Sequence, residues 1–172
     1  MKTNLILSVL LIAFATVIIN GCKKEETGTA TLIVHLVDTP ATYDAVHVEV
    51  IGVEVHTNTN GWMIIPVTDT IYDLLQLQDS ANAVLGSLVI PAGTLSQVRL
   101  ILGTHNTVTV SSVVYPLSLS SQDESGLKLN IHQELSANTV YRLVLDFNAA
   151  QSVIDNGNGT YRLKPVIKAS FQ

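Results

Sequence analysis

The chain has 172 residues, of which 47% are hydrophobic and 5% aromatic, and its formal net charge is −5 at pH 7. This length suits one domain with a hydrophobic core, and the acidic balance argues against nucleic-acid binding, which needs a basic face. The chain holds a single cysteine, so no disulfide can form within it.

The first 21 residues predict a lipoprotein signal peptide. Lys2 gives a positive start, residues 5–19 are almost all apolar, and the small Gly21 precedes Cys22. The apolar run is too short for a comfortable membrane span and is typical of a secretory signal. The Cys22 thiol can take a diacylglycerol group, and cleavage frees its amine for a further acyl chain such as palmitate. Two or more acyl chains anchor a protein stably. An ordinary or uncleaved signal is the alternative.

Residues 22–28 predict a lipidated, flexible tether to the membrane. A lysine pair and a glutamate pair directly follow Cys22, and this polar stretch is unlike a folded element. The pattern resembles the surface-export tether of some Gram-negative bacteria. We therefore expect an outer-membrane lipoprotein that faces outward, with a periplasm-facing placement as the alternative. Residues 29–172 then form a single domain.

Apolar and polar residues alternate with a period of two in the first half of this domain. The alternation changes phase at Gly52, as in a β-bulge, and Pro66 indicates an edge strand. An Asn-Thr-Asn-Gly turn at 58–61 predicts a hairpin, and 79–87 predicts a loop or one helical turn. We expect strands at residues 30–37, 46–56, 62–67 and 71–77.

The second half continues the same pattern. A helical turn is expected at 149–154 and a tight turn at 156–159. Strands are expected at residues 97–102, 108–110, 113–119, 127–131, 141–147 and 161–169. About nine or ten short strands, with turns at each break and no long helical pattern, predict an all-β sandwich. Because successive strands are joined by short turns, we expect mostly antiparallel sheets.

Short segments spread over nearly the whole mature chain carry a family resemblance. They are LVDTP at 36–40, YDAV at 43–46, GVEVH at 52–56, GW at 61–62, DLL at 73–75, IPAGT at 90–94, QVRL at 97–100, SGLKL at 125–129, LDF at 145–147 and KPVI at 164–167. By these segments the chain resembles an uncharacterised family, a domain of unknown function in secreted bacterial and archaeal proteins that are often lipoproteins. The resemblance implies an immunoglobulin- or transthyretin-like sandwich and assigns no activity.

Two groups of residues suggest metal binding. If the first two strands form a hairpin about the 39–43 loop, His35 lies opposite His47 and Glu49, and two imidazoles with a carboxylate suit zinc. Asp38 and Asp44 bracket the same loop, and their oxygens suit Ca²⁺. Alternating polar residues are also what any solvent-facing strand shows, and Asp residues stabilise turns. We expect no cofactor, with Ca²⁺ as the alternative.

Two aromatic residues and two hydroxyl residues are further candidates. Trp62 and Tyr72 would stack sugar rings if they are exposed, whereas a tryptophan in the core or at its rim is the alternative. Thr70 and Ser80 each stand in an Asp–Ser/Thr–apolar triplet that resembles the O-glycosylation site of some surface-exporting bacteria. Such triplets also arise by chance.

The sequence lacks the motifs of the common hydrolases. It contains no Gly-x-Ser-x-Gly, no His-Glu-x-x-His and no phosphate-binding loop. We therefore expect a non-enzymatic binding or adhesion module at the cell surface, with a glycan or protein ligand. The alternatives are a structural subunit of a surface fibre and, with less support, a hydrolase of extracellular polymers.

Overall fold

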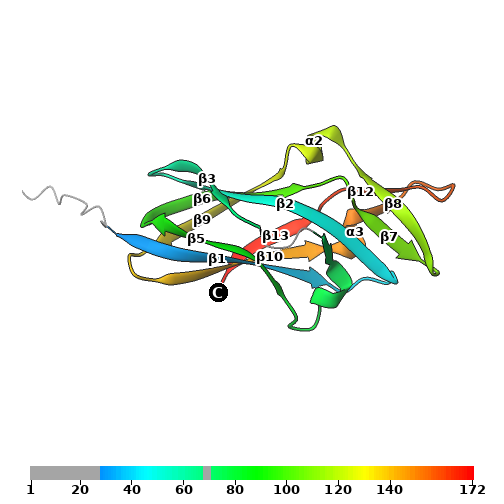
Figure 1. Cartoon of the computed structure of the whole chain (residues 1–172), viewed down its shortest axis with the longest axis horizontal. Helices are drawn as coiled ribbons and strands as arrows, with labels where there is room; N and C mark the ends of the chain where they lie inside the picture. Colours follow the sequence, from blue (N-terminus) through cyan, green and yellow to red (C-terminus); the bar gives the residue numbers. More distant parts are fainter. Residues whose placement is uncertain (1–27, 68–70) are drawn as a thin grey trace, which may run out of the picture.

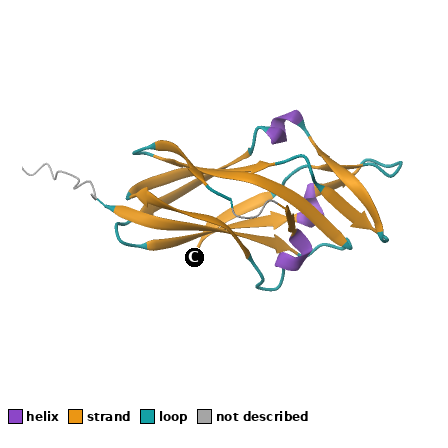
Figure 2. Cartoon of the chain, in the orientation of Figure 1, coloured by secondary structure: helices purple, strands orange, loops and turns teal. Residues whose placement is uncertain are grey.

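The computed structural model describes residues 28–67 and 71–172, and strands make up most of them (Figures 1 and 2). Two sheets of four and nine strands pack face to face, so the predicted all-β sandwich is confirmed. Within the described residues, no helix combines the length and the apolar character that a membrane crossing needs.

The elements follow one another in short steps along the chain. The strands are β1 (Thr29–Thr39), β2 (Ala45–Thr57), β3 (Gly61–Ile65), β4 (Ile71–Asp73), β5 (Ala83–Pro91), β6 (Gly93–Leu102), β7 (Thr107–Val110), β8 (Val113–Leu119), β9 (Leu127–Leu135), β10 (Val140–Asn148), β11 (Val153–Asp155), β12 (Tyr161–Leu163) and β13 (Ile167–Phe171). Three single-turn helices interrupt them, namely the 3₁₀ helix η1 (Leu74–Leu77), α2 (Ser121–Glu124) and α3 (Ala149–Ser152).

The small sheet has the strand order β13-β10-β1-β5. Its two central strands, β1 and β10, run parallel over nine residue pairs, whereas β5 and β13 pair antiparallel to them. The central strands alternate buried and half-exposed residues, because one face lies on the core and the other faces solvent.

The large sheet is organised around the 13-residue strand β2. The first half of β2 pairs with β4 and β7, and its second half pairs with β3 and β6. Strand β9 extends the sheet beyond β6, and β8, β12 and β11 extend it beyond β7. The register of β2 and β6 shifts between Val50 and Gly52, which confirms the predicted bulge at the glycine.

The core lies between the two sheets and is fully apolar at its centre. Leu32, Leu145 and Phe147 of the small sheet and Val53 and Leu100 of the large sheet have no exposed area. Each such side chain contributes about 1.5–3 kcal/mol by its burial. The sandwich is therefore stabilised by packing between the sheets and by the strand pairing within them.

Four expectations from the sequence are wrong in pairing or in extent. The expected 71–77 strand ends at Asp73, and Leu74–Leu77 form the 3₁₀ helix η1. The first two strands form no hairpin, because β1 lies in the small sheet and β2 in the large one. The expected 79–87 loop ends at Asn82, where β5 begins. The expected 161–169 strand is interrupted at Lys164 and Pro165, and its halves, β12 and β13, lie in different sheets.

Candidate functional site

Two rows of side chains cross the outer face of the β3-β2-β6-β9 part of the large sheet. Strand register places their members side by side: Trp62, His56, Gln97 and Asn130 form the Trp62 row, and Ile64, Glu54, Arg99 and Lys128 form the Arg99 row. The residues between the rows, such as Val55 and Val98, are buried in the core. Because side chains alternate along a strand, both rows face outward.

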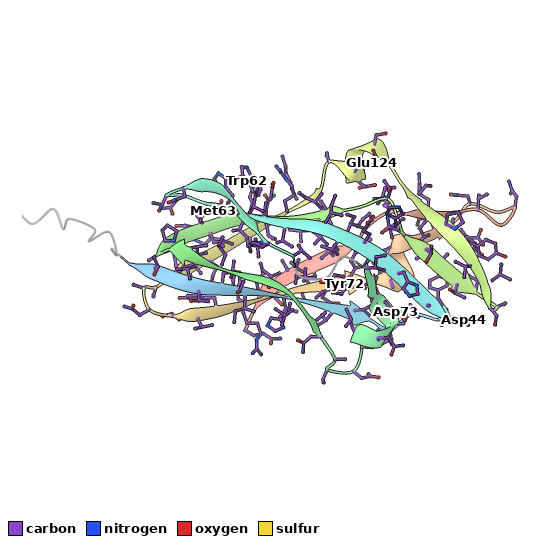
Figure 3. The ribbon with its side chains drawn as sticks, viewed as in Figure 1. Asp44, Trp62, Met63, Tyr72, Asp73 and Glu124 are labelled. Atoms are coloured by element: carbon purple, nitrogen blue, oxygen red, sulfur yellow. The ribbon has the colours of Figure 1, made fainter. Side chains whose placement is uncertain are left out.

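Trp62 is held in place by two neighbours on this face. The guanidinium carbon of Arg99 lies 4.3 Å from the centroid of the indole ring. The His56 ring meets the indole edge-on, with centroids 5.2 Å apart. Trp62 keeps 37% of its surface exposed, and Figure 3 shows it on the outer side of β3. The indole is therefore partly exposed, and its two neighbours fix its orientation.

Arg99 connects three strands through its side chain. Its Nη1 donates to Glu54 Oε2 over 2.6 Å, and the two side chains are only 20% and 19% exposed. A charge-assisted hydrogen bond in such a partly enclosed position is stronger than one on an open surface. Since Arg99 belongs to β6, Glu54 to β2 and Trp62 to β3, these contacts hold the edge strand β3 onto the sheet.

We expect Arg99→Met to lower the free energy of unfolding by about 1–2 kcal/mol, because it removes the cation–π contact and leaves Glu54 without its partner. Trp62 is the sole tryptophan, so its fluorescence follows both the local change and urea unfolding. Lys128→Met is the matched control, since Lys128 is exposed and opposite Arg99 in register; it should change stability by less than about 0.5 kcal/mol. Equal effects of the two substitutions would contradict the role of Arg99.

An ordered pair of amides lies at the other end of the Trp62 row. Gln97 Nε2 donates to Asn130 Oδ1 over 2.9 Å. This bond leaves the Asn130 Nδ2 donors and the Gln97 Oε1 acceptor without a partner in the described part of the chain. Nearby, His56 Nδ1 lies 2.9 Å from Ser96 Oγ. The row therefore joins an aromatic surface to free amide hydrogen-bonding groups.

The structure does not bring together the residues considered for zinc. His35 lies on β1 of the small sheet, is 8% exposed, and its Nδ1 lies 2.7 Å from Asn82 Oδ1. His47 and Glu49 lie on β2 of the large sheet. Glu49 instead binds His105, whose backbone N–H and ring nitrogen lie 2.9 Å from its Oε2. These hydrogen bonds, that of the backbone first, hold the pKa of Glu49 below its usual value.

The two aspartates considered for Ca²⁺ bind different segments of the backbone. Asp38 Oδ1 accepts from the N–H of Ala149 over 2.9 Å, and its Oδ2 accepts from Gln78 Nε2 over 3.2 Å. Asp44 Oδ2 accepts from the N–H of Ser112 over 2.7 Å. Across residues 28–67 and 71–172, no three His, Cys, Asp or Glu side chains are grouped to hold a metal ion. Asp44 thus holds the turn at residues 111–112, as the turn-stabilising alternative expects, whereas Asp38 links β1 to α3 and to Gln78.

The other predicted site residues have mixed outcomes. Tyr72 is only 7% exposed on β4, so it is wrong as an exposed stacking surface; its ring faces the core because β4 pairs with β2 at Val48, which is also buried. Ser80 is exposed in a turn and has a φ of 78°. Cys22 and Thr70 lie outside the described residues.

Arg99, Gln97 and Asn130 were missed by reasoning from the sequence. Alternation places Glu54 and His56 on a polar face, but it does not say which later strand pairs with theirs. Strand register brings Gln97 and Asn130 to His56 from 41 and 74 residues away. Apolar and polar residues alternate in the LKLN and QVRL segments, so the sequence shows that Gln97 and Asn130 lie on polar faces. Only the pairing of the strands shows that these faces join into one row.

Comparisons with known proteins give one match. Residues 29–165 match the model of a family described as Domain of unknown function (DUF4382). Comparisons with curated proteins and with solved structures give no match.

Proposed function

The chain belongs to the DUF4382 family of domains of unknown function, and membership assigns no activity. We propose, from the chain's own residues, that it is a lipid-anchored binding module of the bacterial cell surface. Cys22 would carry the lipid, and the sandwich would face outward from the outer membrane. The Trp62 row is the observation that carries the binding role, because it presents a fixed, partly exposed indole beside free amide groups.

The shape of the domain supports this arrangement. Strand β1 begins at Thr29 at one end of the elongated sandwich, next to the turn between β9 and β10 (Figure 1). The outer face of the large sheet runs along the long axis from that end. A tether that joins the domain at its end leaves this broad face open to solvent and to ligands.

The surroundings of Glu49 and Glu54 on the large sheet, and of Asp38 on the small sheet, favour binding over hydrolysis. Glycoside hydrolysis needs two carboxyl groups that face the substrate, one of them with a raised pKa. Glu54 is paired with Arg99, and Glu49 is hydrogen-bonded to His105. Asp38, whose pKa is raised, binds the backbone of α3 at the edge of the core. None of these three carboxylates therefore stands opposite another across a free surface.

The charged edge strand β9 favours a binding module over a fibre subunit. A fibre subunit would accept a neighbour's strand along an open edge. The edge strand β9 carries Lys128, His132 and Glu134, and charges on an edge strand oppose such pairing. Strand β9 is thus protected in a way that proteins use against strand addition.

The lipid anchor is tested by Cys22→Ser in the full-length chain, expressed in a Gram-negative host. We expect the wild type to sediment with outer membranes, and we expect the variant to lose this association because its hydroxyl takes no thioether-linked diacylglycerol. Cell fractionation and immunoblotting measure the distribution. A variant that sediments with membranes as the wild type does would contradict lipid anchoring.

The outward placement is tested on intact cells with the wild-type chain. Added protease is expected to digest the sandwich without permeabilisation, while a periplasmic marker protein in the same cells stays protected. Digestion that requires a permeabilised outer membrane would show a periplasm-facing domain and would contradict the proposed placement.

A further inference from the structure

We propose that the Trp62 row binds a neutral glycan chain, with a sugar ring packed on the indole of Trp62 and sugar hydroxyls hydrogen-bonded to Gln97 and Asn130. This inference rests on the proposed binding function and names the ligand class and the residues that take it.

The indole of Trp62 is oriented before any ligand arrives. Arg99 covers one face of the ring at 4.3 Å, and His56 meets it edge-on. The 37% of Trp62 that stays exposed is the surface left for a ligand. A side chain that is already fixed loses little conformational freedom on binding. The C–H groups on one face of a pyranose ring form the flat, weakly polar surface that packs well against such a ring.

The amide pair offers what sugar hydroxyls need. A hydroxyl group both donates and accepts a hydrogen bond. The bond from Gln97 to Asn130 fixes both side chains and leaves two N–H donors on Asn130 Nδ2 and one acceptor on Gln97 Oε1. These groups lie next to one another on adjacent strands. Two neighbouring hydroxyls of one sugar ring can therefore be bound at once.

The length of the row indicates a chain of sugars. Trp62 and Asn130 belong to the first and last of four adjacent strands. Adjacent strands are about 4.8 Å apart, so the two backbones are separated by about 14 Å. One sugar ring is shorter than this distance. A ligand that reaches both the indole and the amides must therefore contain more than one ring.

Charge on this face favours a neutral ligand. The Trp62 row contains no Asp, Glu, Lys or Arg. In the neighbouring row, the positive charge of Arg99 is matched by Glu54. An acidic glycan would find only Lys128 as a free cation in these two rows, and an isolated exposed lysine adds little affinity at physiological salt.

The test uses the full-length protein in detergent micelles and native gel electrophoresis with soluble polysaccharides. The neutral probes are dextran, xylan, mannan and laminarin, and the acidic probes are alginate and polygalacturonate. We expect at least one neutral polysaccharide to retard the wild type. Trp62→Ala should weaken this binding about tenfold or more, which corresponds to about 1.4 kcal/mol. Asn130→Ala should weaken it by about threefold to tenfold.

Two control variants separate the Trp62 row from the rest of the face. Ile64 is 69% exposed on the same strand but belongs to the Arg99 row, so Ile64→Ala should bind as the wild type does. Because Trp62→Ala removes a contact that holds β3, its melting temperature is measured beside that of Trp62→Phe, which should regain part of the binding. Asn130 is exposed, so Asn130→Ala decides the question if the tryptophan variant is unstable.

Three results would overturn the inference. The first is that no neutral polysaccharide retards the wild type. The second is that only acidic polysaccharides do so and Lys128→Ala abolishes the effect. The third is that folded Trp62→Ala and Asn130→Ala variants both bind as the wild type does. A chain that is anchored and outward-facing but binds no polysaccharide would overturn this inference alone and leave a surface module with a protein ligand.

Discussion

Gly86→Ala is expected to lower the free energy of unfolding by about 3 kcal/mol or more. A Cβ atom at this position of β5 would collide with the backbone carbonyl oxygen of Pro66 and would lie 2.9 Å from Cγ2 of Ile65. Ile65 has no exposed area, and a backbone carbonyl cannot turn away as a side chain can. The added methyl group must therefore push β3 and β5 apart, and overpacking of this kind is strongly destabilising.

Gly103→Ala is the matched control for this prediction. A Cβ atom at Gly103 would meet the carboxylate and Cγ of Glu49, which belong to a flexible side chain and not to the backbone. The side chain can swing toward solvent and lose the hydrogen bonds of its carboxylate to His105, so we expect a clearly smaller loss of stability than at Gly86. Urea unfolding followed by Trp62 fluorescence and by circular dichroism measures both variants. Equal losses at the two glycines would contradict the rigid contact between β5 and Pro66.

The contact at Gly86 also concerns the candidate binding face. Strand β3 carries Trp62 on its outer side and Ile65 in the core. One edge of β3 pairs with β2, and the segment that follows β3 lies against β5. The position of the indole thus depends on packing between the two sheets as well as on Arg99. We infer that a change in the core at Gly86 would also disturb the Trp62 row.

Alternation of apolar and polar residues was enough to predict most strands and the fold class. It fails where a residue interrupts the pattern for a reason that lies elsewhere in the fold. Strand β5 was missed because its alternation is broken by Gly86, next to a register shift of β1 between Val34 and His35. Glycine stands there because Pro66, 20 residues earlier, comes close. No local propensity reveals such a contact.

Strand partners were harder to predict than strands. A period of two shows which face of a strand is buried, and both β1 and β2 carry the same signal. It does not show whether two such strands pair side by side or face each other across a core. The 40–44 loop joins strands of opposite sheets, so the histidines considered as one zinc site lie in different sheets. For the same reason, the sequence indicates Trp62 and His56 of the Trp62 row but not Gln97 and Asn130, which come from strands whose pairing it does not show.

The lipoprotein signal stays a prediction, because residues 1–27 lie outside the described part. Strand β1, the first described strand, starts at one end of the sandwich (Figure 1), where a tether would join it, and the Cys22→Ser experiment tests the lipid anchor.

Asp38 makes the stability of the sandwich depend on pH. Burial raises the pKa of Asp38 from 3.8 to about 6. The hydrogen bonds from Ala149 and Gln78 partly offset this rise, and the nearby Asp146 adds to it. Between about pH 4 and pH 6 the folded chain holds a proton that the unfolded chain has released. Stability therefore rises as the pH falls through this window, and at pH 7 the buried charge costs about 2–3 kcal/mol relative to the neutral acid.

Asp38→Asn should remove this dependence. The asparagine keeps an oxygen that can accept from the N–H of Ala149, and it carries no charge into the 6% exposed site. We expect the free energy of unfolding at pH 7 to rise by about 1–2 kcal/mol, less than the full electrostatic cost because the bond from Gln78 must rearrange. Urea titrations at intervals from pH 4 to pH 8 should show a flatter profile for this variant than for the wild type.

Asp44→Asn is the control, because Asp44 is exposed and its carboxylate also accepts a backbone N–H, that of Ser112. It should keep the wild-type slope between pH 4 and pH 6. A wild-type slope in Asp38→Asn would show that another group governs this window, and it would remove the argument that Asp38 is buried as a charge. Loss of the slope in Asp38→Asn would instead identify Asp38 as the group that titrates in this window. Its carboxylate lies between the end of β1 and the start of α3, so its ionisation would oppose the packing of these two elements.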